Sequence, residues 1–167
     1  PALDIAACRE MRERQRRTLS ARVPELLHRV TWLDALPPEP LNGVLLANEV
    51  LDALPVERFR MRHGRPSQLG VQVVGGQFAW AERPAPGPLA AAVADLQGEL
   101  GQSLPDGYTT EIGLRQPVWL RSLFAALGRG LALCIDYGGT RREIYHAGRR
   151  DGTLVCHYRH RQHTDPF

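Results

Sequence analysis

The sequence predicts an α/β protein in which a parallel sheet is interrupted by an inserted antiparallel β element. Two short apolar runs, at residues 44–47 and 131–135, are each followed by polar side chains. Such runs are typical of strands buried on both faces of a parallel sheet. Between them, residues 56–61 and 68–82 alternate apolar and polar side chains, which indicates antiparallel strands. Helical patterns separate the apolar runs, as an α/β fold requires.

The helices and strands of the first part of the chain are predicted from its apolar runs and from the prolines that interrupt regular structure. The expected elements are, in order, a helix at residues 8–28, a short strand at 29–33, a buried strand at 43–47 and a helical turn at 49–54. Pro24 can open a last helical turn or a second helix. Prolines between residues 37 and 40 make the loop before the buried strand, and Pro55 stops the helical turn.

The rest of the chain begins with the antiparallel meander, in which Gly75-Gly76 is a good two-residue hairpin turn. After it we expect, in order, a helix at 89–100, a short strand at 108–112, a helix at 116–128 with Pro117 in its first turn, and the apolar strand at 131–135. The last thirty residues are rich in Arg and His and are expected to be irregular.

The domain organisation follows from this order of elements. Residues 1–55 and 105–167 are expected to form one domain, and residues 56–104 are expected to be an insertion that consists of the meander and a helix. Neither end of the chain has the character of a natural terminus. We therefore expect the chain to be a piece of a longer protein.

Composition and charge narrow the class of protein. The chain has 167 residues, of which 43% are hydrophobic and 23% are charged, as in an ordinary globular domain. A net charge of +3 gives little support to nucleic-acid binding. The three cysteines lie far apart, which fits a reducing compartment such as the cytoplasm. No run approaches the ~18 apolar residues of a membrane-spanning helix.

Polar side chains that could bind a ligand follow the predicted parallel strands. Asp34, the pair Asn48-Glu49, and Asp136 each stand where such a strand ends. Because parallel strands end at one edge of a sheet, these side chains can converge on one crevice. Carboxylates there can accept hydrogen bonds from a ribose hydroxyl or an exocyclic amine. Each acid taken alone could instead be a helix cap or a loop residue.

Other familiar site patterns find no support. The chain has neither a Gly-rich phosphate loop nor a G-x-S-x-G elbow. Cys156, His157, His160 and His163 are spaced in a way that invites a zinc site. Three ligands within seven residues would need a continuous helix, which Thr164-Asp165-Pro166 opposes. We expect no metal here, and these side chains better suit contact with a partner or a carboxylate.

Three segments together resemble the MidA-like methyltransferases: ANEVLDALPVERF at 47–59, IDYGG at 135–139, and GTLVCHYRHRQHTDPF at 152–167. TWLDALP at 31–37, GYTTEI at 107–112 and the helix that contains Trp119 fit the same pattern. Mitochondrial members of that family are complex I assembly factors that methylate an arginine of a complex I subunit. The resemblance implies a Rossmann-like class I methyltransferase that uses S-adenosyl-L-methionine and acts on a protein. The family's first strand and its Gly-rich loop are expected before Pro1.

The resemblance also implies roles for individual residues. Asp34 is expected to contact the adenine, Asn48 and Glu49 to lie beside the methionine part and the reacting methyl, and Asp136 to follow the next strand. Asp4 is a weaker match for the acid that binds the ribose.

For the chemistry, we expect Glu49 and Asp52 to hold a guanidinium bidentately and to accept its proton, while Asn48 orients the cofactor or the substrate. Asp52 could instead cap a turn or pair with an arginine such as Arg58. The substrate pocket is expected to include Tyr108, Glu111, Tyr137, His157 and His160. The competing hypothesis is a non-catalytic module whose Arg-rich ends bind nucleic acid or an acidic protein.

Overall fold

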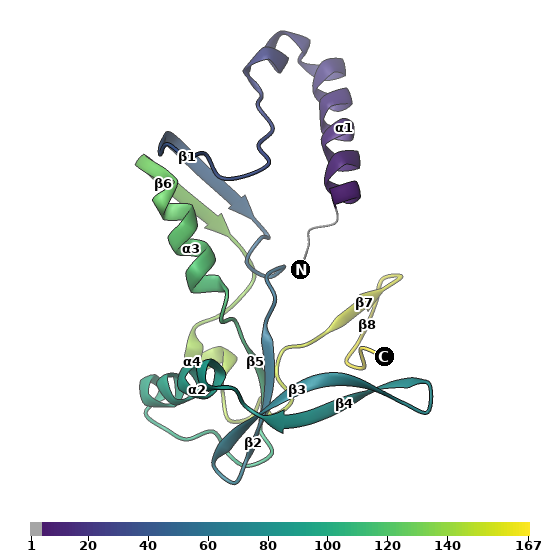
Figure 1. Ribbon diagram of the computed structural model, residues 1–167, viewed down its shortest axis with the longest axis vertical. Helices are drawn as coiled ribbons and strands as arrows, with labels where there is room; N and C mark the ends of the chain where they lie inside the picture. Colours follow the sequence, from purple (N-terminus) through teal and green to yellow (C-terminus); the bar gives the residue numbers. More distant parts are fainter. Residues whose placement is uncertain (1–4) are drawn as a thin grey trace. The chain divides into compact units, whose positions relative to one another are not determined.

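The computed structural model of the protein describes residues 5–167 and, from residue 9 onward, their side chains. Contacts between residues divide the chain into two compact units, with the boundary between Leu41 and Asn42. The described part of the first unit holds two helices and an extended segment, and the sheets lie in the second unit except for Leu41, the first residue of β1 (Figure 1). No helix among residues 5–167 is both long enough and apolar enough to cross a membrane.

The first unit consists of helix α1 (Ile5–Arg22), the 3-10 helix η1 (Pro24–Arg29) and an extended segment after it. The sequence correctly predicted a helix with a second turn opened by Pro24. The strand predicted at residues 29–33 is wrong, because these residues pair with no strand. Side chains of α1 hold the segment instead: Arg12 donates to the carbonyl of Leu33 at 2.7 Å, and the Trp32 indole N–H donates to Gln15 at 2.9 Å.

The second unit begins with a two-stranded sheet of β1 (Leu41–Asn48) and β6 (Leu127–Ile135). The strands run in the same direction and are neighbours, as predicted (Figure 1). They approach closely at Gly43 and Gly130, where a Cβ on Gly130 would lie 1.7 Å from the Gly43 carbonyl oxygen. The helix predicted to reach residue 128 ends earlier, since α3 is Gln116–Ala125 and the chain then enters β6.

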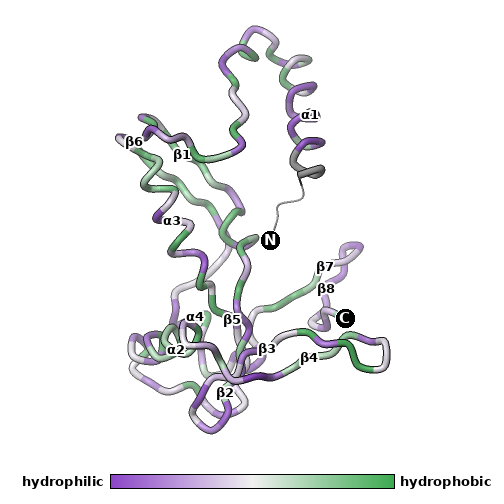
Figure 2. The backbone as a smooth tube through the Cα atoms, viewed as in Figure 1, coloured by the Kyte–Doolittle hydropathy of each residue, from purple (hydrophilic) through white to green (hydrophobic). Residues whose placement is uncertain are grey.

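The apolar side chains of this pair are exposed, contrary to the burial on both faces that their sequences predicted. Figure 2 shows β1 and β6 as mainly hydrophobic, yet the side chains of Val44, Leu46 and Leu131 are 74%, 64% and 60% exposed. Helix α3 packs against β6, but the described chain leaves most of the apolar surface of the pair uncovered. Only Ala47 of β1 is buried.

The second sheet has four antiparallel strands in the order β4-β3-β2-β5. Their bounds are β2 (Glu57–Arg62), β3 (Arg65–Val74), β4 (Gln77–Pro84) and β5 (Thr109–Ile112). The predicted meander is confirmed, and its two hairpin loops, His63-Gly64 and Gly75-Gly76, have the positive φ that such loops require. Because β5 pairs with β2, this sheet extends beyond residue 104, where the sequence placed the end of the insertion.

A hydrophobic core lies between this sheet and helix α2 (Gly87–Leu100). Phe59 and Met61 alternate with Arg58, Arg60 and Arg62 along β2, so that one face of the strand is apolar and the other is basic. The apolar face is wholly buried. The other buried members of the core are Leu89, Val93, Leu96, Leu104 and Tyr108.

The end of the chain is more regular than its sequence predicted. It contains a short helix, α4 (Arg141–Ile144), and a hairpin of β7 (Cys156–Tyr158) and β8 (Arg161–His163). The hairpin loop is Arg159-His160, and both residues have positive φ. An Asn or Gly would have predicted such a loop from the sequence, and the chain has neither residue at these two positions. Cys134 and Cys156 carry free thiols.

Candidate functional site

Hydrogen bonds join the end of β1 to the end of β6, both between backbone groups and through the carboxylate of Asp136. The N–H of Glu49 donates to the carbonyl of Ile135 at 2.8 Å. Asp136 Oδ2 accepts the N–H of Leu51 at 2.7 Å and that of Asp52 at 3.3 Å. The convergence of the two strand ends, which the sequence predicted, is therefore present, and Asp136 fixes the loop that follows β1.

Glu49 adopts an unusual backbone conformation at this point. Its φ is +51°, in the left-handed region that a non-glycine residue enters at a cost of ~1–3 kcal/mol. Asn48, Glu49 and Asp52 are all exposed, so their polar atoms can reach a ligand. The loop is closed by a bond from the N–H of Leu54 to the carbonyl of Leu51 at 3.2 Å. The helical turn predicted at residues 49–54 is not formed: the segment contains one hydrogen-bonded turn and no helix, and it presents Asn48 and Glu49 at the edge of the sheet.

The other two predicted cofactor residues, Asp34 and Asp4, belong to the first part of the chain, and their roles stay predictions. Asp34 follows no strand; it lies in the first unit, where Arg12 pairs with its carboxylate at 2.5 Å. Asp4 lies outside the residues that the structure describes. Tyr137, in contrast, directly follows Asp136 and is 78% exposed. Its N–H donates to Asp136 Oδ1 at 2.8 Å.

Tyr108 lies in the core of the antiparallel layer and not at the strand ends. Its side chain has no exposed surface, and its hydroxyl donates to the carbonyl of His146 at 3.2 Å. Burial raises the pKa of this phenol above its ordinary value. In this structure Tyr108 therefore packs the core and lines no open pocket.

Glu111 is buried where β5 meets the segment before β7. Its Oε2 accepts the N–H of Thr153 at 2.7 Å and the Thr153 hydroxyl at 3.1 Å. Arg58 Nε lies 3.2 Å from Oε1 as an ion pair, without the alignment of a hydrogen bond. Gly152 has a φ of +80°, and a Cβ there would lie 2.5 Å from Oε2. Glu111 thus links residues 107–112 to residues 152–167, two of the motif-bearing segments.

Comparison with known proteins identifies the family. A family model described as "putative S-adenosyl-L-methionine-dependent methyltransferase" matches residues 5–167. The chain belongs to this methyltransferase family. The resemblance of its motifs to methyltransferases is confirmed at this level. No curated protein matches the chain.

Two solved structures from Burkholderia thailandensis resemble this member of the family. One, described as a "likely methyl transferase" bound to S-adenosyl-homocysteine, is 44% identical with a TM-score of 0.82, over 95% of this chain and 40% of that one. The other, a native structure of an uncharacterized protein of the same superfamily, is 45% identical with a TM-score of 0.82, over 93% of this chain and 40% of that one. The chain thus spans 40% of the length of both. The predicted α/β fold, with a parallel sheet and an antiparallel sheet, is the fold of a methyltransferase.

The two histidines predicted to line the substrate pocket of this methyltransferase-family chain lie on the β7–β8 hairpin. His157 and His160 are both exposed, and His160 is in the hairpin loop. Cys156 faces His163 across the hairpin, so His157 projects from the opposite face of the strand. Residues 5–167 contain no group of three potential metal ligands. The absence of a structural zinc stays a prediction.

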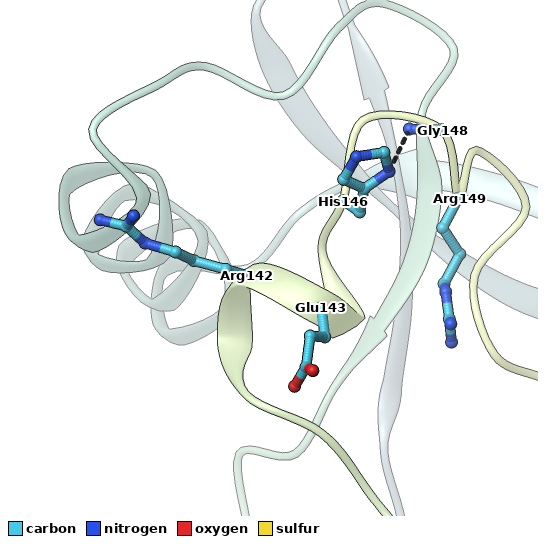
Figure 3. Close-up of a pocket in the computed structure, with 5 residues that line it drawn as sticks. All are labelled: Arg142, Glu143, His146, Gly148 and Arg149. Carbon is cyan, nitrogen blue, oxygen red and sulfur yellow. Dashed lines mark hydrogen bonds between the residues drawn. The ribbon is translucent and has the colours of Figure 1, made fainter.

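The methyltransferase-family chain also has an open depression that the sequence did not predict. It is lined by Arg142, Glu143, His146, Gly148 and Arg149 (Figure 3). Thr140 donates its N–H and its hydroxyl to Glu143 at 2.7 and 2.8 Å, and these bonds lower the pKa of that carboxyl. Arg142 and Arg149 point in different directions. The T-x-x-E capping pattern at residues 140–143 is a sequence signal that could have located this region, and no prediction was made from it.

Proposed function

We propose that the protein is an S-adenosyl-L-methionine-dependent methyltransferase whose site lies at the ends of β1 and β6. One observation carries the proposal: hydrogen bonds join the two strand ends and present Asn48 and Glu49, with Glu49 in a left-handed conformation. In α/β sheets, ligands bind beyond the carboxyl ends of parallel strands. Membership of the family, and the S-adenosyl-homocysteine bound to a structure 44% identical to this chain, support the same reaction.

The groups exposed at these strand ends suit the cofactor. The Asn48 amide and the Glu49 carboxylate can accept hydrogen bonds from hydroxyl and ammonium groups, and both side chains are exposed. When bound, S-adenosyl-L-methionine supplies a methyl group on a positively charged sulfur. Asp136 acts mainly through the loop, because its carboxylate already accepts the N–H groups of Leu51 and Tyr137. Asp34 and Asp4 remain candidates for contacts to the nucleoside.

The acceptor that best suits the acidic loop is a cation. An arginine side chain is protonated in water, so its attack on a methyl group needs a base and a fixed orientation. Glu49 and Asp52 lie on one loop and can hold a guanidinium through charge-assisted hydrogen bonds and take up its proton. Asn48 orients the reactants. We infer that the substrate is a protein arginine, and the resemblance to the MidA-like family favours a subunit of respiratory complex I in the bacterial cytoplasm.

Cofactor binding tests the position of the site. In the whole protein, Asn48→Ala is expected to weaken the binding of S-adenosyl-homocysteine about tenfold in calorimetry, since one hydrogen bond contributes ~0.5–1.5 kcal/mol. Asn42 is the matched control, because it is an exposed asparagine at the opposite end of the same strand. Asn42→Ala should leave the affinity unchanged. If both variants bind S-adenosyl-homocysteine as tightly as the wild type, the cofactor site does not lie at the end of β1.

A further inference from the structure

The loop of the β7–β8 hairpin differs from the other two-residue hairpin loops of the chain. His63-Gly64 and Gly75-Gly76 each place glycine in the left-handed region. The β7–β8 loop is Arg159-His160, with φ of +49° and +61° and no glycine. A non-glycine residue pays ~1–2 kcal/mol in this conformation, and Asn-Gly is the favoured pair. The loop therefore carries two basic residues at positions where the backbone conformation favours Asn or Gly.

The tip of this hairpin, residues 158–161, is basic and exposed. Arg159, His160 and Arg161 are all exposed, and the guanidinium of Arg159 lies 5.2 Å from the centre of the Tyr158 ring. Among the described residues, no carboxylate forms a salt bridge with any of them. Arginines elsewhere in the second unit do find such partners, for example Arg60 with Glu82 at 2.7 Å.

Both ends of the segment that carries the tip are held by the antiparallel layer. Before β7, Glu111 accepts two hydrogen bonds from Thr153, and Arg58 donates to the carbonyl of Asp151 at 3.3 Å. After β8, the ring of Phe167 lies 5.1 Å from that of Trp80. Arg58 stacks on the same Trp80 at 4.6 Å, so the two attachments share one aromatic ring. The tip thus projects from a segment that is fixed at both ends, which lowers the entropy cost of binding.

We propose that the hairpin tip is a docking site for an acidic segment of a partner protein. Arginine presents a planar fork of donors that matches a carboxylate; Arg159 lies in the loop, Arg161 directly follows it, and both side chains are exposed. Nucleic acid fits less well. Affinity for nucleic acid comes largely from neutralising several phosphates with basic side chains, whereas this tip offers three basic side chains on a chain of net charge +3. The proposal concerns partner binding and needs no cofactor.

The test measures binding of a fluorescein-labelled decaglutamate peptide to the full chain by fluorescence anisotropy. Arg159→Asn combined with His160→Gly installs the favoured loop and removes the basic tip. We expect the affinity to fall about tenfold, the loss of one good charge-assisted contact, while the melting temperature stays equal or rises. Arg17→Gln is the matched control, because it removes one formal charge from an exposed position on α1. It should leave the affinity unchanged.

Three outcomes would overturn the proposal. The first is unchanged peptide affinity in the double variant. The second is an equal loss in Arg17→Gln, which would make the binding a general effect of charge. The third is tighter, tip-dependent binding of a ten-nucleotide oligothymidylate, which would assign the tip to nucleic acid. If the double variant melts at a lower temperature, the single variant Arg159→Gln is tested with the same peptide, because it leaves His160 in the loop. We expect its peptide affinity to fall at least threefold. An unchanged affinity would contradict the proposal.

Discussion

The parallel pair β1-β6 and the four-stranded antiparallel sheet both contain apolar side chains, but they differ in what covers those side chains. In the antiparallel sheet, Phe59 and Met61 have no exposed surface, because α2 packs on that face. In the parallel pair, Val44 and Leu46 are 74% and 64% exposed. An apolar run predicts the strands of the parallel pair and an alternation predicts those of the antiparallel sheet, but burial depends on which other elements pack on each sheet.

This difference separates stability from chemistry. The antiparallel layer holds the hydrophobic core, and the candidate site lies at the ends of the thinly covered parallel pair. Substitutions in the core should therefore change the free energy of unfolding, whereas substitutions at the strand ends should change catalysis with little effect on folding. Each of the following experiments tests one side of that division.

The largest expected effect is on stability. Phe59→Ala should lower the free energy of unfolding by about 3–5 kcal/mol, the usual cost of a large core truncation. Val44→Ala, which shortens an exposed apolar side chain, should change it by less than about 0.5 kcal/mol. Chemical denaturation of both variants measures the contrast. A decrease of more than about 2 kcal/mol in the free energy of unfolding for Val44→Ala would mean that the parallel pair is covered in solution. The two sheets would then not differ in burial.

The second effect is on catalysis. In the whole protein, Glu49→Gln should reduce methyl transfer about a hundredfold, because it removes a charge-assisted contact at the reacting centre. The melting temperature should not change, since Glu49 is exposed. A transfer assay with labelled cofactor, run beside a thermal melt, measures both quantities. Glu99→Gln, an exposed glutamate of α2, should leave both as they are. Full transfer by Glu49→Gln would remove Glu49 from the catalytic role, and a collapsed melt would shift the assignment to Asp52.

The smallest expected effect is on the stability of the protein at low pH. Arg62 and then Arg60 hold the pKa of Glu82 below its ordinary value of 4.5 through hydrogen bonds on the basic face of the antiparallel sheet. The folded pKa is lower than the unfolded one, so this stabilisation is complete above the unfolded pKa and is lost as pH falls through the folded pKa. Because Glu82 is partly exposed, the contribution is about 1 kcal/mol or less. Glu82→Gln should flatten the acid side of the stability curve, and 1 M salt should shrink the difference. An acid side that stays equally steep in Glu82→Gln would assign the effect to another carboxylate.

The sequence predicted those elements whose signals are local. Gly75-Gly76 and the alternation around it predicted the meander, and the apolar runs before Asn48 and Asp136 predicted two neighbouring parallel strands. Side-chain roles that depend on distant contacts could not be predicted. The hydrogen-bond partner of Glu111, Thr153, lies 42 residues away, a pairing that no local pattern reveals.

The errors have the same origin. Residues 29–33 have the composition of a strand, but a strand exists only where another backbone accepts its hydrogen bonds, and α1 supplies side chains instead. The β7–β8 hairpin was missed because Arg159-His160 lacks the glycine that usually marks such a loop. The motifs identified the methyltransferase family correctly, while the arginine substrate and the link to complex I remain proposals.

Asp136 gives the candidate site an uneven electrostatic field. Its carboxylate accepts N–H groups from Leu51, Asp52 and Tyr137, and the positive ends of these peptide dipoles offset much of its charge. No comparable bonds to the side chains of Glu49 and Asp52 occur within residues 5–167. The negative potential at the proposed site therefore comes mainly from the β1 side. We expect this asymmetry to orient a cationic substrate as it approaches.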